Sequence, residues 1–166
     1  MSAAIREVMR ARFCAPKWAL CFEVQDATGM RATRSADAIA MSLWPSLGLE
    51  LHGFEFKTSR ADWLRELKDP SKAQTFKRYC DRWFLVTTSR EIVRPGELPE
   101  GWGWLVVQGG RMYAIAAAPK LEPEPISRPF LAALLRRADE GPGAFAPIEI
   151  DTPEAQEDRL RFGGVS

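Results

Sequence analysis

The chain has 166 residues, of which 46% are hydrophobic and 27% are charged, and this composition is typical of a globular domain. The formal net charge of +1 gives no global sign of a nucleic-acid-binding protein. Three cysteines without a Cys-x-x-Cys pair favour reduced thiols over a disulfide framework or a zinc site. No apolar run is long enough for a secretion signal or a membrane span. We therefore expect a soluble cytoplasmic protein with no membrane partner.

The first third of the chain predicts one helix followed by three strands. Residues 3–13 have the apolar spacing of a short helix, which ends before Pro16. Strands are predicted at 18–24, 35–42 and 49–57, separated by short turns. Three consecutive strands with short connections imply a meander or a group of hairpins.

The middle of the chain changes to a helical period. Ser59 and Asp62 form a capping pattern that opens a helix, and a second helix starts after Pro70 and runs to about residue 80. The inward face of the first helix is predicted to carry Ala61, Leu64 and Leu67. The apolar strand 83–88 follows, so the two helices predict a right-handed crossover between parallel strands.

The last third predicts a hairpin of residues 102–107 and 111–117, and a helix over 127–138. The fold class is therefore α/β, with a mixed sheet of five or six strands and helices on both faces. Residues 1–138 are expected to form one domain. Residues 139–166 are rich in Pro, Gly and acidic residues and predict a flexible tail.

Three charged residues on the second and third strands carry the best chemical signal. Glu55 and Lys57 are two apart in a strand, so both side chains leave the same face of the sheet, and Asp37 lies on the strand before. Carboxylate oxygens suit Mg²⁺ or Mn²⁺, and a neighbouring ammonium can orient water. The pattern favours metal-dependent phosphodiester hydrolysis.

A Glu-x-Lys pair is by itself a weak signal, because charge pairs are common on protein surfaces. The chain contains a second copy, Glu66 and Lys68, on a predicted amphipathic helix. We expect this second pair to be exposed and dispensable for activity.

The order helix, three strands, helix, strand, with Asp37 on the second strand and Glu55-x-Lys57 on the third, resembles the PD-(D/E)xK, restriction-endonuclease-like nuclease superfamily. The wider sequence is similar to the MmcB-like DNA repair proteins and their phage-borne relatives, over about residues 5–135. The segments that carry the likeness are Arg34–Met41, Gly53–Ser59, Arg78–Val86 and Leu98–Val107. The proline that often precedes the Asp is Ala36 here.

The resemblance implies a restriction-endonuclease-like core of αβββαβ order with an added C-terminal hairpin and helix. It implies a Mg²⁺- or Mn²⁺-dependent deoxyribonuclease in DNA repair, recombination or phage DNA processing. Asp37 and Glu55 would ligate the metal together with the backbone carbonyl of Phe56, and Lys57 would complete the catalytic site. An additional acid often precedes the Asp, and Glu23 would then be a further metal ligand, with Glu7 as a competitor.

Two alternatives remain open for Glu23. In the alternation of Trp18, Leu20, Phe22 and Val24, Glu23 points away from the large apolar face. It is therefore either a metal ligand or a solvent-facing strand residue.

Residues 57–82 hold eight Lys or Arg against four acids, which suits contacts to phosphates. A solvated helix face explains the same run of charges. The candidate nucleic-acid-binding residues are Arg34, Arg60, Lys72, Lys77 and Tyr79, with Lys72 and Tyr79 predicted on one face of the second helix.

The main alternative to a nuclease is a DNA-binding accessory protein that keeps the fold without cutting. The sequence leaves open the preferred DNA structure, endonuclease against exonuclease action, and the oligomeric state, including a homodimer.

Overall fold

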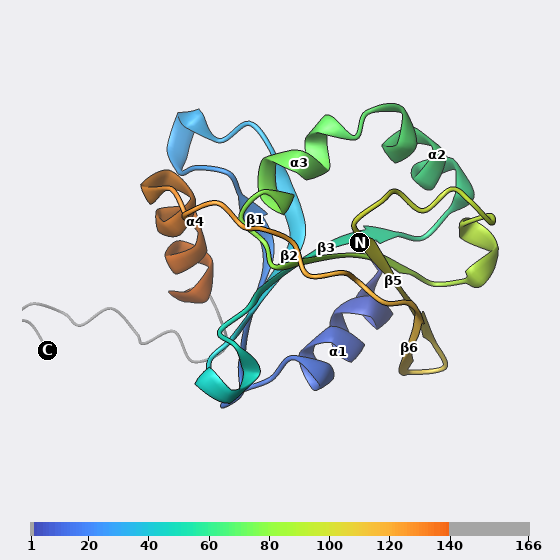
Figure 1. Ribbon diagram of the computed structural model, residues 1–166, viewed down its shortest axis with the longest axis horizontal. Coiled ribbons are helices and arrows are strands. Elements are labelled where there is room, and N and C mark those ends of the chain that lie inside the picture. Colours follow the sequence, from blue (N-terminus) through green and yellow to red (C-terminus); the bar gives the residue numbers. More distant parts are fainter. Residues whose placement is uncertain (1, 140–166) are drawn as a thin grey trace, which may run out of the picture.

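The computed structural model describes residues 2–139 and contains one six-stranded mixed sheet with helices on both faces (Figure 1). The predicted tail lies outside the described residues apart from Asp139. Within the described part of the chain, no helix is long and apolar enough to cross a membrane.

All ten predicted helices and strands are present, within a few residues of their predicted bounds. They are α1 (Ala3–Arg12), β1 (Trp18–Gln25), β2 (Ser35–Ser42), β3 (Leu51–Lys57), α2 (Arg60–Lys68), α3 (Ser71–Lys77), β4 (Arg82–Thr87), β5 (Trp102–Gln108), β6 (Arg111–Ala116) and α4 (Arg128–Asp139).

The strands lie in the sheet in the order in which they occur along the chain. β1, β2 and β3 are antiparallel neighbours, β3, β4 and β5 are parallel neighbours, and β6 returns antiparallel to β5. The two helices α2 and α3 form the connection that a parallel β3–β4 pair needs. The predicted meander, crossover and hairpin are therefore confirmed, and β3 is a central strand of the sheet.

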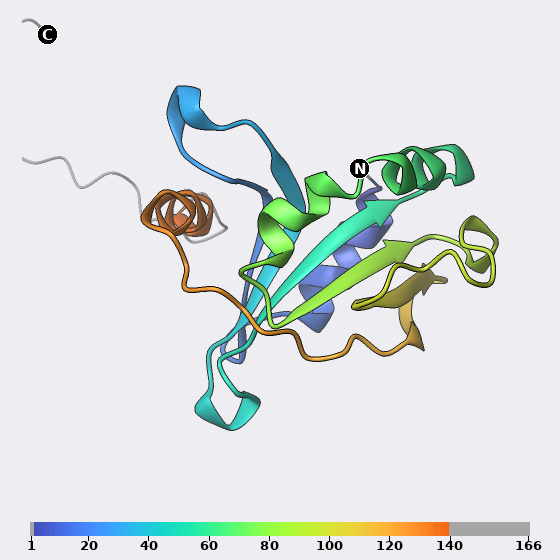
Figure 2. The same ribbon diagram turned by 45° about the horizontal axis from the view of Figure 1, so that its top comes forward.

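Helices lie on both faces of the sheet (Figure 2), and a hydrophobic core forms on each face. The even-numbered side chains of β3, Phe54 and Phe56, pack with α1. The other core includes Trp63 of α2, Phe76 of α3 and Phe130 of α4. Because successive strand residues alternate between faces, the odd-numbered residues of β3 point toward α2 and α3.

The rotation of α2 differs from the prediction. Ser59 caps the helix through a hydrogen bond from the Asp62 N–H, as the sequence predicts. However, the buried residues of α2 are Trp63 and Glu66, whereas Ala61 is exposed and Leu64 is 40% exposed. Of the predicted inward face only Leu67 packs against the core, and the prediction is wrong for Ala61 and Leu64, because burial of the large indole of Trp63 sets the rotation of the helix.

We predict that Gly53→Ala destabilises the protein strongly. A Cβ at Gly53 would lie 2.2 Å from Cζ3 of Trp83, whose side chain is fully buried and has no room to move. Overpacking of this kind costs about 2 kcal/mol or more. Urea unfolding measures the change in the free energy of unfolding.

Gly109→Ala in the β5–β6 turn is the matched control. Its Cβ would meet no atom within 4 Å, so only the positive φ of +58° penalises the change, by about 1 kcal/mol. Equal losses in the two variants would contradict the close packing of Trp83 on Gly53.

Candidate active site

The strands β2 and β3 separate at Asp37. Their backbone pairing ends at Ala38 and Phe54, and beyond it Oδ2 of Asp37 accepts a hydrogen bond of 2.7 Å from the Phe56 N–H. Continuing the register by one residue places Asp37 opposite Glu55. A side-chain carboxylate thus replaces a backbone acceptor, which opens the sheet and leaves two carboxylates side by side.

Lys57 joins β3 to α2 through two buried ion pairs. Its Nζ donates to Oε1 of Glu55 at 2.5 Å and lies 2.8 Å from Oε2 of Glu66. Glu55 is 2% exposed, Glu66 8% and Lys57 9%. From α3, Nζ of Lys72 lies 3.6 Å from the same Oε1 of Glu55. Buried charges need such partners, because unpaired they would carry the full cost of desolvation.

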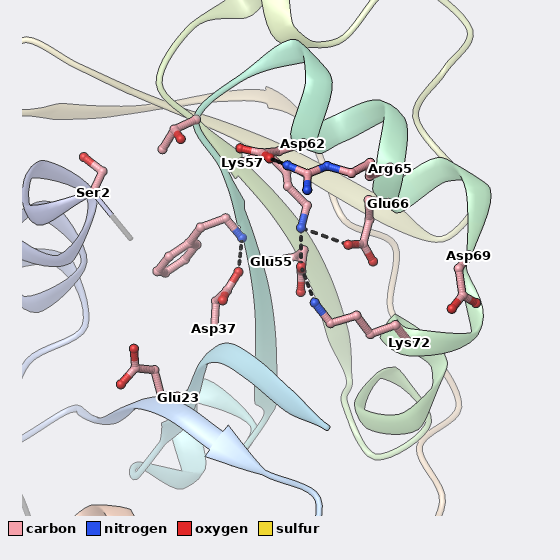
Figure 3. A pocket seen from close by; sticks show the side chains of 12 residues that line it. Ser2, Glu23, Asp37, Glu55, Lys57, Asp62, Arg65, Glu66, Asp69 and Lys72 are labelled. Atoms are coloured by element: carbon pink, nitrogen blue, oxygen red, sulfur yellow. Dashed lines mark hydrogen bonds and ion pairs between the residues drawn. The ribbon is translucent and has the colours of Figure 1, made fainter. Parts of the chain in front are cut away.

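These groups line a cavity of about 590 Å³ between the opened sheet and the helices α2 and α3 (Figure 3). In Figure 3, Asp37 lies below the bonded Phe56 N–H, and Lys57 and Lys72 approach Glu55 from opposite sides. The lining residues are Ser2, Glu23, Asp37, Glu55, Phe56, Lys57, Thr58, Asp62, Arg65, Glu66, Asp69 and Lys72. The three predicted catalytic residues therefore share one cavity.

Asp37 and Glu55 resist ionisation. Burial, and then the negative charge of Asp37, raise the pKa of Glu55 to about 7, although Lys57 opposes the shift. Burial also raises the pKa of Asp37, against the opposing effects of the Phe56 N–H and the two lysines. Burial alone would lower the pKa of Lys57, but Glu55 and Glu66 raise it, so the ammonium remains charged.

The donor set suits a hard cation. Asp37 and Glu55 each use one oxygen, Oδ2 and Oε1, in the contacts above, and their other oxygens accept no hydrogen bond among the described residues. Oε1 of Glu66 is buried and lacks a hydrogen-bond partner within residues 2–139. Mg²⁺ and Mn²⁺ prefer such oxygens and retain several waters. No group of three or more His, Cys, Asp or Glu in the described residues has the geometry of a formed metal site.

Glu23 lies at the rim of the cavity. Its backbone has a φ of +52°, and this left-handed residue interrupts the alternation of β1, so that Phe22 and Val24 pack in different cores. The carboxylate pairs with Arg6 at 2.9 Å and is 53% exposed. The shared face predicted for Phe22 and Val24 is therefore wrong. Glu23 reaches the cavity edge, but its carboxylate is held by α1 rather than beside Glu55 (Figure 3).

Two of the predicted nucleic-acid-binding residues lie on the α3 side of the site. Lys72 lines the cavity, in contact with Glu55. Arg34 donates to the Ser71 hydroxyl at 3.3 Å, at the start of α3. Of these two residues, only Lys72 therefore lines the cavity, whereas Arg34 lies outside its lining.

The other three residues lie elsewhere. Arg60 forms a bidentate ion pair with Glu97 and donates to the carbonyl of Ile92. Lys77 donates to the carbonyl of Glu100 at 3.3 Å.

Tyr79 requires a correction. The helix α3 ends at Lys77, and the Tyr79 ring is buried and stacked on Phe130 with centroids 5.0 Å apart. Tyr79 therefore shares no helix face with Lys72. Because its ring is buried against Phe130, it is a residue of the hydrophobic core and not of the cavity surface.

The basic segment 57–82 is also largely neutralised by internal partners. Lys57 pairs with Glu55 and Glu66, Arg65 with Asp62, and Arg82 with Glu50. The positive charge that this segment offers to phosphates is therefore smaller than its eight basic residues suggest.

Glu66 is the site residue that the sequence interpretation missed. The expectation that Glu66 is an exposed surface charge is wrong, whereas Lys68 is exposed as expected. The position of Trp63 could have indicated the burial of Glu66. A large indole is expected to be buried, and the residue three positions further along lies on the same helix face. Glu66 has that spacing.

Comparisons with known proteins bear on the fold alone. No family model matches the chain, and no curated protein matches it. Among solved structures, the chain is similar to one described as SPO1766, a protein of unknown function from Silicibacter pomeroyi, with 21% sequence identity and a TM-score of 0.53. The match covers 95% of this chain and 87% of that chain, so the likeness extends over nearly the whole sheet and its helices.

We predict that Glu66→Ala destabilises the protein by about 2 kcal/mol, because it removes a buried partner of Lys57 and leaves a space beneath α2. Lys68→Ala, in the same Glu-x-Lys pair, changes an exposed side chain and should cost less than about 0.5 kcal/mol. Urea unfolding of both variants measures the difference. Equal stabilities would mean that Glu66 does not hold Lys57 in solution.

Proposed function

We propose that this chain is a metal-dependent DNA nuclease, in which Asp37 and Glu55 bind Mg²⁺ or Mn²⁺ and Lys57 completes the catalytic site. The observation that carries the proposal is the meeting of these three side chains in one cavity, at the point where β2 and β3 separate.

The electrostatics of the cavity support a cation there. Burial, and then the negative charge of Asp37, raise the pKa of Glu55, and a divalent ion between the open oxygens of the two carboxylates would offset their repulsion. Such an ion, when bound, polarises the scissile phosphate and lowers the pKa of attacking water. The donors present are carboxylates, which suit Mg²⁺ or Mn²⁺ better than zinc.

Each protein group then has a defined task. Asp37 is oriented by the Phe56 N–H, which fixes its second oxygen toward the cavity. The same residue, Phe56, supplies the backbone carbonyl that the family resemblance implies as a further ligand. Lys57, held by Glu55 and Glu66, places a positive charge where negative charge develops on the phosphate. Glu66 acts as a positioning residue for Lys57.

The order of the elements is consistent with the proposal. A helix, three antiparallel strands, a helical crossover and a parallel strand follow one another here, with the acids on the second and third strands. This is the order that the resemblance to PD-(D/E)xK nucleases implies. The proposed role in DNA repair, recombination or phage DNA processing rests on the family resemblance alone.

A non-cleaving DNA-binding protein is the second candidate. One observation favours it: Lys57 and Lys72 both lie on Oε1 of Glu55, so that the charges of the cavity are already partly balanced without a metal. Binding of a divalent cation separates the two candidates.

Cleavage of labelled DNA in Mn²⁺ tests the nuclease directly. Asp37→Asn and Glu55→Gln should each lower the rate by about a thousandfold or more, because they remove metal ligands. Lys57→Ala should cost less, about a hundredfold, since water partly replaces the ammonium. Lys68→Ala, which changes an exposed lysine, is the control and should cleave like the wild type. Full activity of Asp37→Asn would refute the assignment.

Metal binding should depend on pH. Because the pKa of Glu55 is raised to about 7, protons compete with the cation below that pH and leave the carboxylate free above it. Mn²⁺ should therefore raise the melting temperature more at about pH 8 than at about pH 6. Glu55→Gln should abolish the increase, and Glu124→Gln, an exposed control, should retain it. Equal shifts at both pH values in the wild type would contradict the prediction.

A further inference from the structure

A second cavity, of about 440 Å³, lies between α1, β1 and α4. Its lining combines arginines with apolar and aromatic side chains. The lining residues are Arg6, Arg10, Phe13, Cys14, Ala15, Trp18, Leu20, Cys21, Phe22, Glu23 and Arg137. We call this cavity the arginine groove.

The arginine groove is positively charged. Among the described residues, its lining holds three arginines and one acid, Glu23. The Glu23 carboxylate pairs with Arg6, and its backbone carbonyl accepts a 3.0 Å hydrogen bond from Nε of Arg137. The candidate active site has the opposite balance, with six carboxylates and three cations in its lining. A polyanion approaching that acidic cavity therefore needs a cationic surface beside it, and the arginine groove provides one.

The wall of the groove also suits nucleobases. Trp18, Leu20 and Phe22 are only half-buried. The guanidinium carbons of Arg6 and Arg10 lie 4.9 and 5.1 Å from the centre of the Phe22 ring. Aromatic rings and guanidinium groups together are the surfaces on which unpaired bases stack, while the same arginines contact phosphates.

Glu23 connects the two cavities, because it lines both. Its left-handed backbone places the residue at their common rim, between Arg6 on one side and the Asp37 cavity on the other. The two cavities are therefore neighbours that meet at Glu23.

We propose that the arginine groove binds single-stranded DNA and leads it to the site at Asp37 and Glu55; this inference rests on the proposed nuclease function. Arg6, Arg10 and Arg137 bind the phosphates, and Trp18 and Phe22 contact the bases. Duplex DNA fits the groove less well, since its bases are stacked inside the helix and do not reach the rings.

Binding of a labelled oligothymidylate of about 12 nucleotides, in EDTA so that no cleavage occurs, tests the groove by fluorescence anisotropy. Arg10→Glu, a change of an exposed residue, should weaken binding about tenfold at low salt and reduce the slope of log K against log salt by about 0.7. Arg137→Gln should weaken it in the same direction. A duplex of the same length should bind the wild type more weakly.

Arg111→Glu, on the exposed surface of β6 at the opposite edge of the sheet, is the matched control and should bind like the wild type. Melting curves establish that each variant is folded. The inference is overturned if Arg10→Glu binds as tightly as the wild type, if Arg111→Glu weakens binding equally, if duplex is preferred, or if the wild type does not bind the oligonucleotide.

The binding and cleavage results separate the two proposals. Arginine-dependent binding without any metal-dependent cleavage would refute the nuclease and leave the groove standing. Cleavage that needs Asp37 and Glu55 but is unaffected by Arg10→Glu would refute the groove and leave the nuclease standing.

Discussion

The buried lysine at the end of β3 is the interaction on which the site depends. Lys57 lies between Glu55 on its own strand and Glu66 on α2, and all three side chains are at least nine-tenths buried. Three charges in such surroundings are tolerated only as a set, because loss of one leaves the others unpaired in a medium of low dielectric. These ion pairs therefore fix the position of α2 against β3, and with it the position of Glu55 and Lys57 in the cavity.

The geometry of β3 couples this polar cluster to the hydrophobic core. Phe54 and Phe56 pack on one face of the strand, and Glu55 and Lys57 project from the other. The Phe56 N–H, on the same strand, orients Asp37. A shift of β3 by one residue would exchange both faces, so the packing of the two phenylalanines also keeps the three charged groups in register.

The distribution of charge divides the surface near β1 into two regions. The carboxylates gather where β2 and β3 separate, whereas Arg6, Arg10 and Arg137 gather between α1, β1 and α4. Glu23 lies between them and is paired with Arg6. The acidic cavity and the arginine-lined groove thus lie next to each other, with opposite balances of charge in their linings.

The sequence by itself determined the secondary structure and the catalytic candidates, because both follow from local periodicity. Each predicted helix and strand is present. Residues i and i+2 of a strand share a face of the sheet, and for this reason Glu55 and Lys57 lie together. Asp37 joins them because adjacent antiparallel strands bring residues of matching register side by side.

Only the tertiary structure decided which charges are buried and which helix faces turn inward. The rotation of α2 depends on where the indole of Trp63 finds space, and that rotation buries Glu66. Tyr79 is buried because Phe130, 51 residues further along, stacks on its ring. The left-handed turn at Glu23 and the ion pairs that neutralise residues 57–82 likewise depend on partners from distant segments. Local pattern carries no information about such partners, since they meet only when the chain is folded.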